Sequence, residues 1–150
     1  MAGFRQNGFT LIELMVVLVI IGIASAAIGL SIKPDPLNLL RKDAERLAQL
    51  LQVAQAEARA DGRPITWLAD GKGFRFSRRN ERAKGDEQFA DDPLLHPRLW
   101  HSPGLDVRVE PGQNVVLDAE WISQPLRVKL SDGFNSLSVQ RSASGQVRVQ

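Results

Sequence analysis

The chain has 150 residues, a length that supports one folded domain with or without an appended segment. Apolar residues make up 43% and charged residues 24%, which argues against wholesale disorder and against a protein with many membrane spans. The formal charge of +2 at pH 7 gives no sign of a surface built to coat nucleic acid. The absence of cysteine excludes disulfide bonds, thiolate metal sites and cysteine nucleophiles.

The first feature along the chain is an uncharged apolar stretch. Residues 14–32 contain no Asp, Glu, Lys or Arg. A helix of that length is roughly 28 Å long, close to the roughly 30 Å thickness of the hydrocarbon core of a bilayer. We therefore predict a transmembrane helix over residues 9–32. A buried core helix is the alternative, but a stretch this long with apolar residues on every face is rare in a small soluble domain.

A cleaved secretory signal peptide is a second alternative for this segment. Arg5 supplies the positive charge that such a signal has before its apolar part. Three features disagree: Glu13 stands at the edge of the apolar stretch, the stretch is longer than usual, and no small-x-small pattern follows Ile32. The triplet Ala24-Ser25-Ala26 leaves this alternative open.

Glu13 stands one residue before the uncharged stretch. A carboxylate at the edge of a membrane helix costs free energy unless it finds a partner, and no Lys or Arg lies between Gln6 and Ile32. Two interpretations follow. The carboxylate reaches the lipid headgroups, or it pairs with a free α-amino group that cleavage creates nearby.

The sequence Gly8-Phe9-Thr10-Leu11-Ile12-Glu13-Leu14, after a short leader with Arg5, closely resembles the class III signal of type IV pilins and type II secretion pseudopilins. The resemblance implies that residues 1–8 are a leader, which a membrane-embedded prepilin peptidase removes by cutting after Gly8. It implies that Phe9 then becomes the N-methylated first residue. It also implies that Glu13 neutralises the N-terminal amine of a neighbouring subunit during assembly.

A second helix is predicted over residues 37–61, after Pro34 and Pro36 break or kink the first. Its apolar positions step by three or four and form one face: Leu40, Ala44, Leu47, Leu51, Ala54 and Ala58. Its polar positions are expected mainly elsewhere: Arg41, Glu45, Gln49, Gln52, Gln55 and Arg59. Gly62 is expected to cap the helix, and Pro64 prevents its continuation. We interpret this helix as core-facing, with a coiled-coil partner as the minor alternative.

Beyond Gly62 the hydrophobic period changes to two, which is typical of strands. Strands are predicted at residues 65–68, 74–76, 107–109, 126–130, 137–139 and 147–149, with turn sequences at 70–73, 132–133 and 144–145. Residues 77–104 contain three prolines and no clear period, so we predict a long surface loop. The sequence thus predicts an α+β fold, in which residues 33–61 form an amphipathic helix packed on an antiparallel, β-sandwich-like domain of six or seven strands at 62–150.

This order of elements again resembles a pilin, and four segments resemble the minor pseudopilin H family of type II secretion, which includes minor pilins of the FimT and FimU kind: 44–51, 56–59, 62–65 and 73–74. A looser similarity covers residues 144–149. The resemblance implies a single-pass protein of the inner membrane of a Gram-negative cell, with residues 33–150 in the periplasm. It implies assembly with other minor pseudopilins and the major pseudopilin, in a tip complex that supports export of folded proteins. The alternative is a minor type IV pilin for pilus assembly or DNA uptake.

No catalytic, cofactor or metal site is predicted. His96 and His101 are the only histidines, too few ligands for a converging metal site. The acidic residues of the predicted loop match no EF-hand and are interpreted as a solvated face: Asp86, Glu87, Asp91 and Asp92. No nucleophile, Walker or dinucleotide motif occurs. We therefore expect a protein that acts by assembly and not as an enzyme; a membrane-tethered periplasmic enzyme is the remaining alternative.

A run of cations precedes these acids: Arg75, Arg78, Arg79, Arg82 and Lys84. It is either a docking patch for another subunit, a phospholipid headgroup or DNA, or the counterpart of the acids at 86–92. We favour the second interpretation and expect no nucleic-acid partner. The tryptophans are expected to anchor the core or loops: Trp67, Trp100 and Trp121.

Overall fold

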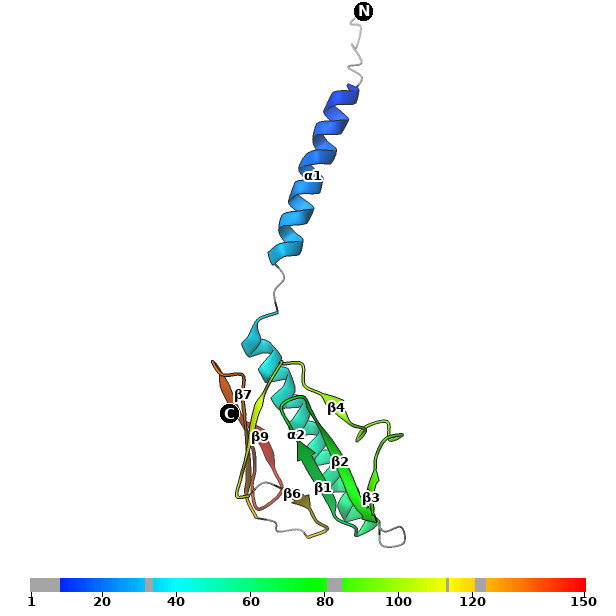
Figure 1. The fold of residues 1–150 in the computed structure, drawn as a ribbon, viewed down its shortest axis with the longest axis vertical. Coiled ribbons are helices and arrows are strands. Elements are labelled where there is room, and N and C mark those ends of the chain that lie inside the picture. Colours follow the sequence, from blue (N-terminus) through cyan, green and yellow to red (C-terminus); the bar gives the residue numbers. More distant parts are fainter. Residues whose placement is uncertain (1–8, 32–33, 81–84, 113, 121–123) are drawn as a thin grey trace, which may run out of the picture. The chain divides into compact units, whose positions relative to one another are not determined.

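The computed structural model describes residues 9–31, 34–80, 85–112, 114–120 and 124–150 (Figure 1). It contains two compact units, Met1–Pro34 and Asp35–Gln150. The first contains one helix, and the second contains one helix and two sheets.

Helix α1 runs from Leu11 to Ser31. Its apolar side chains are exposed in the isolated chain, with exposed fractions between 45% at Val17 and 79% at Leu11. Apolar residues therefore lie on every side of α1, and the helix has no polar face of the kind that surface helices show. Among the residues that the structure describes, no helix meets a combined criterion of length and apolar character for crossing a membrane.

Helix α2 runs from Pro36 to Asp61, which confirms the predicted helix and adds one residue at its start. Asp35 is the N-cap, and its Oδ1 accepts a hydrogen bond from the Leu37 N–H at 3.1 Å. Pro36 occupies the first turn, where its missing N–H costs nothing. Gly62 ends the helix with φ of 64°, the left-handed conformation that glycine adopts without strain, so the predicted C-cap is also confirmed.

The predicted apolar face of α2 faces the core. Each of its six residues is at most 1% exposed: Leu40, Ala44, Leu47, Leu51, Ala54 and Ala58. Gln55, which we expected on another face, is also buried, so that expectation was wrong. Asp43 is fully buried as well; it lies on the apolar face between Leu40 and Leu47, but its charge gave no reason to expect burial. Both polar residues are buried because partners from distant parts of the chain satisfy them, as described below.

The described residues form nine strands: β1 Ile65–Ala69, β2 Gly73–Asn80, β3 Gly85–Gln88, β4 Arg98–Leu99, β5 Asp106–Glu110, β6 Val115–Leu117, β7 Leu126–Ser131, β8 Ser136–Arg141 and β9 Val147–Val149. One sheet has the order β3-β2-β1-β6, with β4 also paired to β2. The other has the order β5-β7-β8-β9. Every pairing is antiparallel, so the predicted α+β architecture with an antiparallel β domain is confirmed, but the six or seven strands expected are fewer than the nine found among the described residues.

The prediction of one long loop over residues 77–104 was wrong in three places. β2 continues to Asn80, and both β3 and β4 lie in this range. β3 was not predicted because it is an edge strand with every residue exposed, and such a strand has no alternation of apolar and polar residues. β6 was missed because Val115, Val116 and Leu117 are all apolar, so the strand has no alternation of apolar and polar residues.

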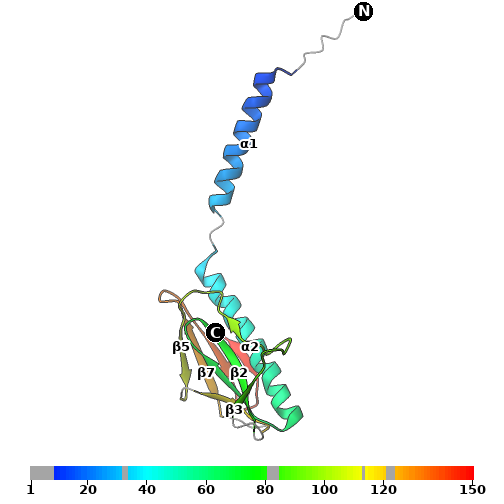
Figure 2. The ribbon, with the colours of Figure 1, turned by 45° about the vertical axis from the view of Figure 1, so that its right-hand side comes forward.

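Helix α2 packs against both sheets, contacting β8 and β9 of one and β1 and β6 of the other. Figures 1 and 2 show α2 running alongside the strands. Aromatic rings fill part of the core, where the Phe74 ring centroid lies 4.7 Å from that of Trp100 and 6.3 Å from that of Trp67. Trp67 and Trp100 are buried, as expected of core anchors, whereas Trp121 lies outside the described residues.

Candidate assembly site

The N-terminal segment carries the residues that the sequence analysis singled out. Gly8 lies outside the described residues. Phe9, the first described residue, is 81% exposed. Thr10 precedes α1, and its hydroxyl and carbonyl oxygens accept hydrogen bonds from the Glu13 N–H at 3.4 and 3.0 Å. Thr10 therefore caps the helix, which fixes Glu13 in its first turn.

Glu13 is exposed at the N-terminal end of α1. The unpaired N–H groups at this end carry partial positive charge, so a carboxylate is favourable here. The Thr10-x-x-Glu13 spacing is also that of a capping box. Within the part of the chain that the structure describes, no ion pair involves Glu13, so its charge is available to a cation from outside the chain.

Asp43 ties the 99–102 segment to the first half of α2. Its Oδ1 accepts hydrogen bonds from the backbone N–H of His101 at 2.9 Å and from Arg46 Nη2 at 3.1 Å, and its Oδ2 accepts from the Ser102 N–H at 2.9 Å. His101 Nδ1 lies 2.8 Å from the same Oδ1. Burial lowers the pKa of Arg46, which also donates to the Leu99 carbonyl at 2.6 Å. Sequence spacing gave no signal for this anchor, because its partners His101 and Ser102 lie more than fifty residues away.

Gln55 performs the same task in the second half of α2. Its Nε2 donates to the Asp118 carbonyl at 2.6 Å, and its Oε1 accepts from Arg141 Nη1 at 2.8 Å. Arg141 is 6% exposed and also donates to the Gln124 carbonyl at 3.3 Å. Burial lowers the pKa of the Arg141 guanidinium. Gln55 thus joins α2 to β8 and to the segment between β6 and β7, which explains its burial.

The basic run does not form one surface patch in the described residues. Arg78 is buried, its Nη1 lies 2.7 Å from Asp61 Oδ2, and its guanidinium carbon lies 5.4 Å from the centroid of the Phe89 ring. Arg79 is opposite Asp86 in the β2–β3 register, and Arg78 is opposite Glu87. This pairing supports charge compensation. Arg82 and Lys84 lie outside the described residues.

The two histidines have separate partners. His96 Nδ1 lies 2.9 Å from the Asp92 carbonyl, whereas His101 contacts Asp43. Asp92 itself caps a turn, because its Oδ1 accepts the N–H groups of Leu94 and Leu95 at 2.8 Å. Those two hydrogen bonds lower the pKa of Asp92. Across the described residues, no group of three or more His, Asp or Glu is placed to hold a metal ion.

Comparisons with known proteins find similar sequences for two parts of the chain. The model of the prokaryotic N-terminal methylation motif matches residues 3–29, and the model of type II transport protein GspH matches residues 43–149. Type II secretion system protein H of Aeromonas hydrophila is 31% identical over 98 residues, which cover 63% of this chain and 52% of the relative. The chain therefore spans about half the length of that curated relative.

Two solved structures share the fold. The minor pseudopilin EpsH from the type 2 secretion system of Vibrio cholerae has a TM-score of 0.59 and 16% identity, over 74% of this chain and 95% of that one. The type IV minor pilin FimU of Pseudomonas aeruginosa has a TM-score of 0.56 and 17% identity, over 75% and 89%. These likenesses confirm the predicted pilin-like fold. Since its model matches well over half of the sequence, the chain belongs to the type II transport protein GspH family.

Proposed function

We propose that the chain is a minor pseudopilin of a type II secretion system, which acts by assembly in the tip complex of a periplasmic pseudopilus and supports export of folded proteins across the outer membrane. The observation that carries this proposal is the presence of an N-terminal methylation motif and a GspH domain in one chain. Its partners are other minor pseudopilins and the major pseudopilin. The role is structural rather than enzymatic.

The proposed location is the inner membrane, with a single pass over residues 9–32 and residues 33–150 in the periplasm. The sequence supports this with the uncharged stretch at 14–32. The exposed apolar side chains of α1 support it too, because water is a poor solvent for a helix that is apolar on every side. Lipid before assembly, and neighbouring α1 helices after it, are environments in which these side chains lose contact with water.

Prepilin peptidase is the proposed processing partner. It cuts between Gly8 and Phe9, and the new terminus at Phe9 is N-methylated. The match of the methylation motif to residues 3–29 supports this assignment. Cleavage removes Arg5 and leaves a cationic amine four residues before Glu13.

Glu13 is the proposed assembly residue. An unpaired carboxylate in an apolar environment loses its hydration, which costs free energy. Beside the cationic N-terminus of another subunit this cost is offset, because the attraction between opposite charges is strong where the dielectric constant is low. The exposure of Glu13 and its place in the first turn of α1 leave it accessible to such a neighbour.

The test replaces Glu13 with leucine in the full chain and follows three outcomes. Mass spectrometry should still find a methylated Phe9 terminus, since the cleavage junction is intact, and membrane insertion should persist, because leucine inserts more easily than glutamate. Co-purification with other pseudopilins and secretion should fall. Glu57→Leu removes an exposed carboxylate from α2 and should leave both unchanged. Normal assembly and secretion of Glu13→Leu would contradict the pairing mechanism.

The similarity to FimU supports a second candidate, a minor type IV pilin with a role in pilus assembly or DNA uptake. This candidate shares the leader, Glu13 and the fold. The two differ in binding: a protein for DNA uptake should bind duplex DNA with an affinity that falls steeply as salt rises. Binding of that kind would favour the second candidate over the first.

A further inference from the structure

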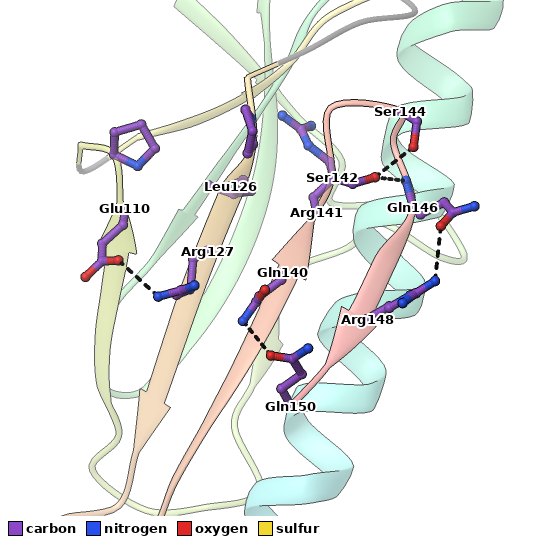
Figure 3. Close-up of a pocket in the computed structure, with 12 residues that line it drawn as sticks. Glu110, Leu126, Arg127, Gln140, Arg141, Ser142, Ser144, Gln146, Arg148 and Gln150 are labelled. Atoms are coloured by element: carbon purple, nitrogen blue, oxygen red, sulfur yellow. Dashed lines mark hydrogen bonds and ion pairs between the residues drawn. The ribbon is translucent and has the colours of Figure 1, made fainter.

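A groove of about 700 Å³ lies on the outward face of the β5-β7-β8-β9 sheet (Figure 3). Polar side chains dominate its lining: Glu110, Arg127, Gln140, Gln146, Arg148 and Gln150. They come from strands β5, β7, β8 and β9 and from the residues next to β9. No described residue of the N-terminal segment lines the groove, and the pairing mechanism proposed above for Glu13 does not use it.

Strand register explains why these side chains gather. Glu110 is opposite Arg127, Arg127 is opposite Gln140, and Gln140 is opposite Arg148, so one row of polar residues crosses all four strands. The next row contains Arg108 and, opposite it, Lys129. The residues between the rows, such as Val128 and Leu130, point into the core, because neighbouring side chains alternate across a sheet.

The face carries more positive than negative charge. Its cations are Arg108, Arg127, Lys129 and Arg148, and its carboxylates are Asp106 and Glu110. Asp106 pairs with Arg108 at 2.9 Å, and Glu110 lies 3.9 Å from Arg127. Among the described residues, neither Lys129 nor Arg148 has an ion pair. Lys129 and Arg148 therefore have no carboxylate partner among the described residues, and the ion pair of Arg127 with Glu110 is long, at 3.9 Å.

Hydrogen-bond donors are also in excess. The Gln150 Oε1 accepts from Gln140 Nε2 at 2.9 Å, and the Gln146 Oε1 accepts from Arg148 Nη2 at 3.4 Å (Figure 3). These contacts use two of the groove's amide oxygens, and its other side-chain acceptors are the Glu110 carboxylate, the Gln140 amide oxygen and the hydroxyls of Ser142 and Ser144. A guanidinium has five N–H donors and no acceptor, so most donors of Arg127 and Arg148 remain available. The groove thus matches a ligand rich in acceptors and negative charge.

We propose that this groove docks a carboxylate-rich segment of a neighbouring subunit. Planar guanidinium groups bind carboxylates through two parallel hydrogen bonds. The glutamine amides can both donate to and accept from the peptide groups of such a segment, a match that a sugar-phosphate backbone would not use. The groove is also short, because four strands span only about 15 Å across the sheet, and this length suits a short peptide segment. The proposal rests on the proposed function for the identity of the subunit.

The test uses the processed full chain in nanodiscs of zwitterionic lipid and a fluorescent oligoglutamate peptide as the probe, with fluorescence anisotropy as the readout. Changing Arg127→Glu together with Arg148→Glu should weaken binding by about tenfold or more, since it reverses charge inside the groove. The matched control, Arg41→Glu with Arg75→Glu, changes net charge equally at exposed positions outside it. An equal loss of affinity in both variants would overturn the proposal, because only net charge would then matter.

Competition identifies the class of ligand. Unlabelled oligoglutamate should displace the probe more effectively than duplex DNA or anionic vesicles at equal charge concentration; stronger displacement by DNA or vesicles would overturn the choice of a protein partner. In cells, Gln140→Cys gives a single thiol in a chain without cysteine, and its crosslink should map to an acidic segment of another pseudopilin. Glu13→Leu should leave peptide binding unchanged, so a failure of the N-terminal assembly mechanism and a failure of the groove are distinguishable.

Discussion

The two long helices of this chain shield their apolar side chains from water in different ways. α2 has one apolar face, and the core of its own unit covers that face almost completely. α1 is apolar on every side, and its side chains are exposed in the isolated chain. Since an amphipathic helix gains most of its stability from packing, α2 depends on residues of the same chain. For α1, the proposed function assigns that role to lipid or to other subunits.

Asp43 in α2 and Glu13 in α1 also differ in burial and in hydrogen-bond and ion-pair partners. Asp43 in α2 is fully buried and accepts hydrogen bonds from the His101 and Ser102 backbones and from Arg46. Glu13 in α1 is exposed and has no ion pair among the described residues. The first carboxylate holds two segments of the folded unit together, and the second is the one that the proposed function assigns to assembly.

The largest expected effect sharpens the contrast between the apolar faces. Leu47→Ala should lower the free energy of unfolding of the second unit by about 2–5 kcal/mol, because it leaves a cavity at a fully buried position. Urea denaturation, followed by tryptophan fluorescence, measures the change. Leu18→Ala in α1 is the matched control and should leave this transition unchanged. A similar loss in both variants would show that α1 belongs to the same folding unit.

The contrast between the carboxylates is tested by Asp43→Ala. It leaves the N–H groups of His101 and Ser102 without their acceptor, at about 1–3 kcal/mol for the buried Ser102 N–H and less for that of His101, which is part-buried. The unfolding free energy should fall by several kcal/mol. Asp43→Asn, which keeps one carbonyl oxygen, should recover part of the loss, and Glu45→Ala at an exposed position should have little effect. Equal stability of Asp43→Ala and Glu45→Ala would mean that the 99–102 segment is held by other contacts.

A substitution at Gly62, which ends α2, is expected to change stability less, and only through backbone conformation. Gly62 has φ of 64°, and a Cβ added there would meet no atom within 4 Å. Gly62→Ala should therefore cost only the strain of placing an L-residue in the left-handed region, about 1 kcal/mol. Thermal unfolding against Gly85→Ala, where the Cβ also has open space and φ is not in that region, measures it. No difference between the two would show that the helix ends in another conformation.

The smallest effect concerns pH. The backbone N–H groups of Asn135 and Phe134 donate to Asp132 in the β7–β8 turn and lower the pKa of its carboxyl. Because the folded pKa is below the unfolded one, near 3.9, this contribution to stability is present above about pH 4 and is lost as the pH falls toward the folded value. Asp132→Asn should weaken the decline in stability below about pH 4. The control is Asp86→Asn on β3, and an identical acid profile for Asp132→Asn and the wild type would contradict the prediction.

Local patterns predicted the features that depend on neighbouring residues. The buried face of α2, from Leu40 to Ala58, follows from helical periodicity, and the end of α2 at Gly62 follows from cap chemistry. Asp70 and Asp132 lie in the predicted turns, where their carboxylates accept backbone N–H groups from residues two and three positions ahead. In each case, the interaction partners are only a few residues apart.

Only the tertiary structure decided the burial of Asp43, Gln55 and Arg78. Each is polar, and each has a hydrogen-bond partner farther along or back in the chain: His101 for Asp43, Arg141 for Gln55 and Asp61 for Arg78. The pairing of β3, β4 and β6 was decided in the same way, since these strands are too short or too exposed to show a period. The physical reason is that hydrophobic periodicity records which face of an element avoids water, whereas hydrogen-bond partners are set by which distant segments meet.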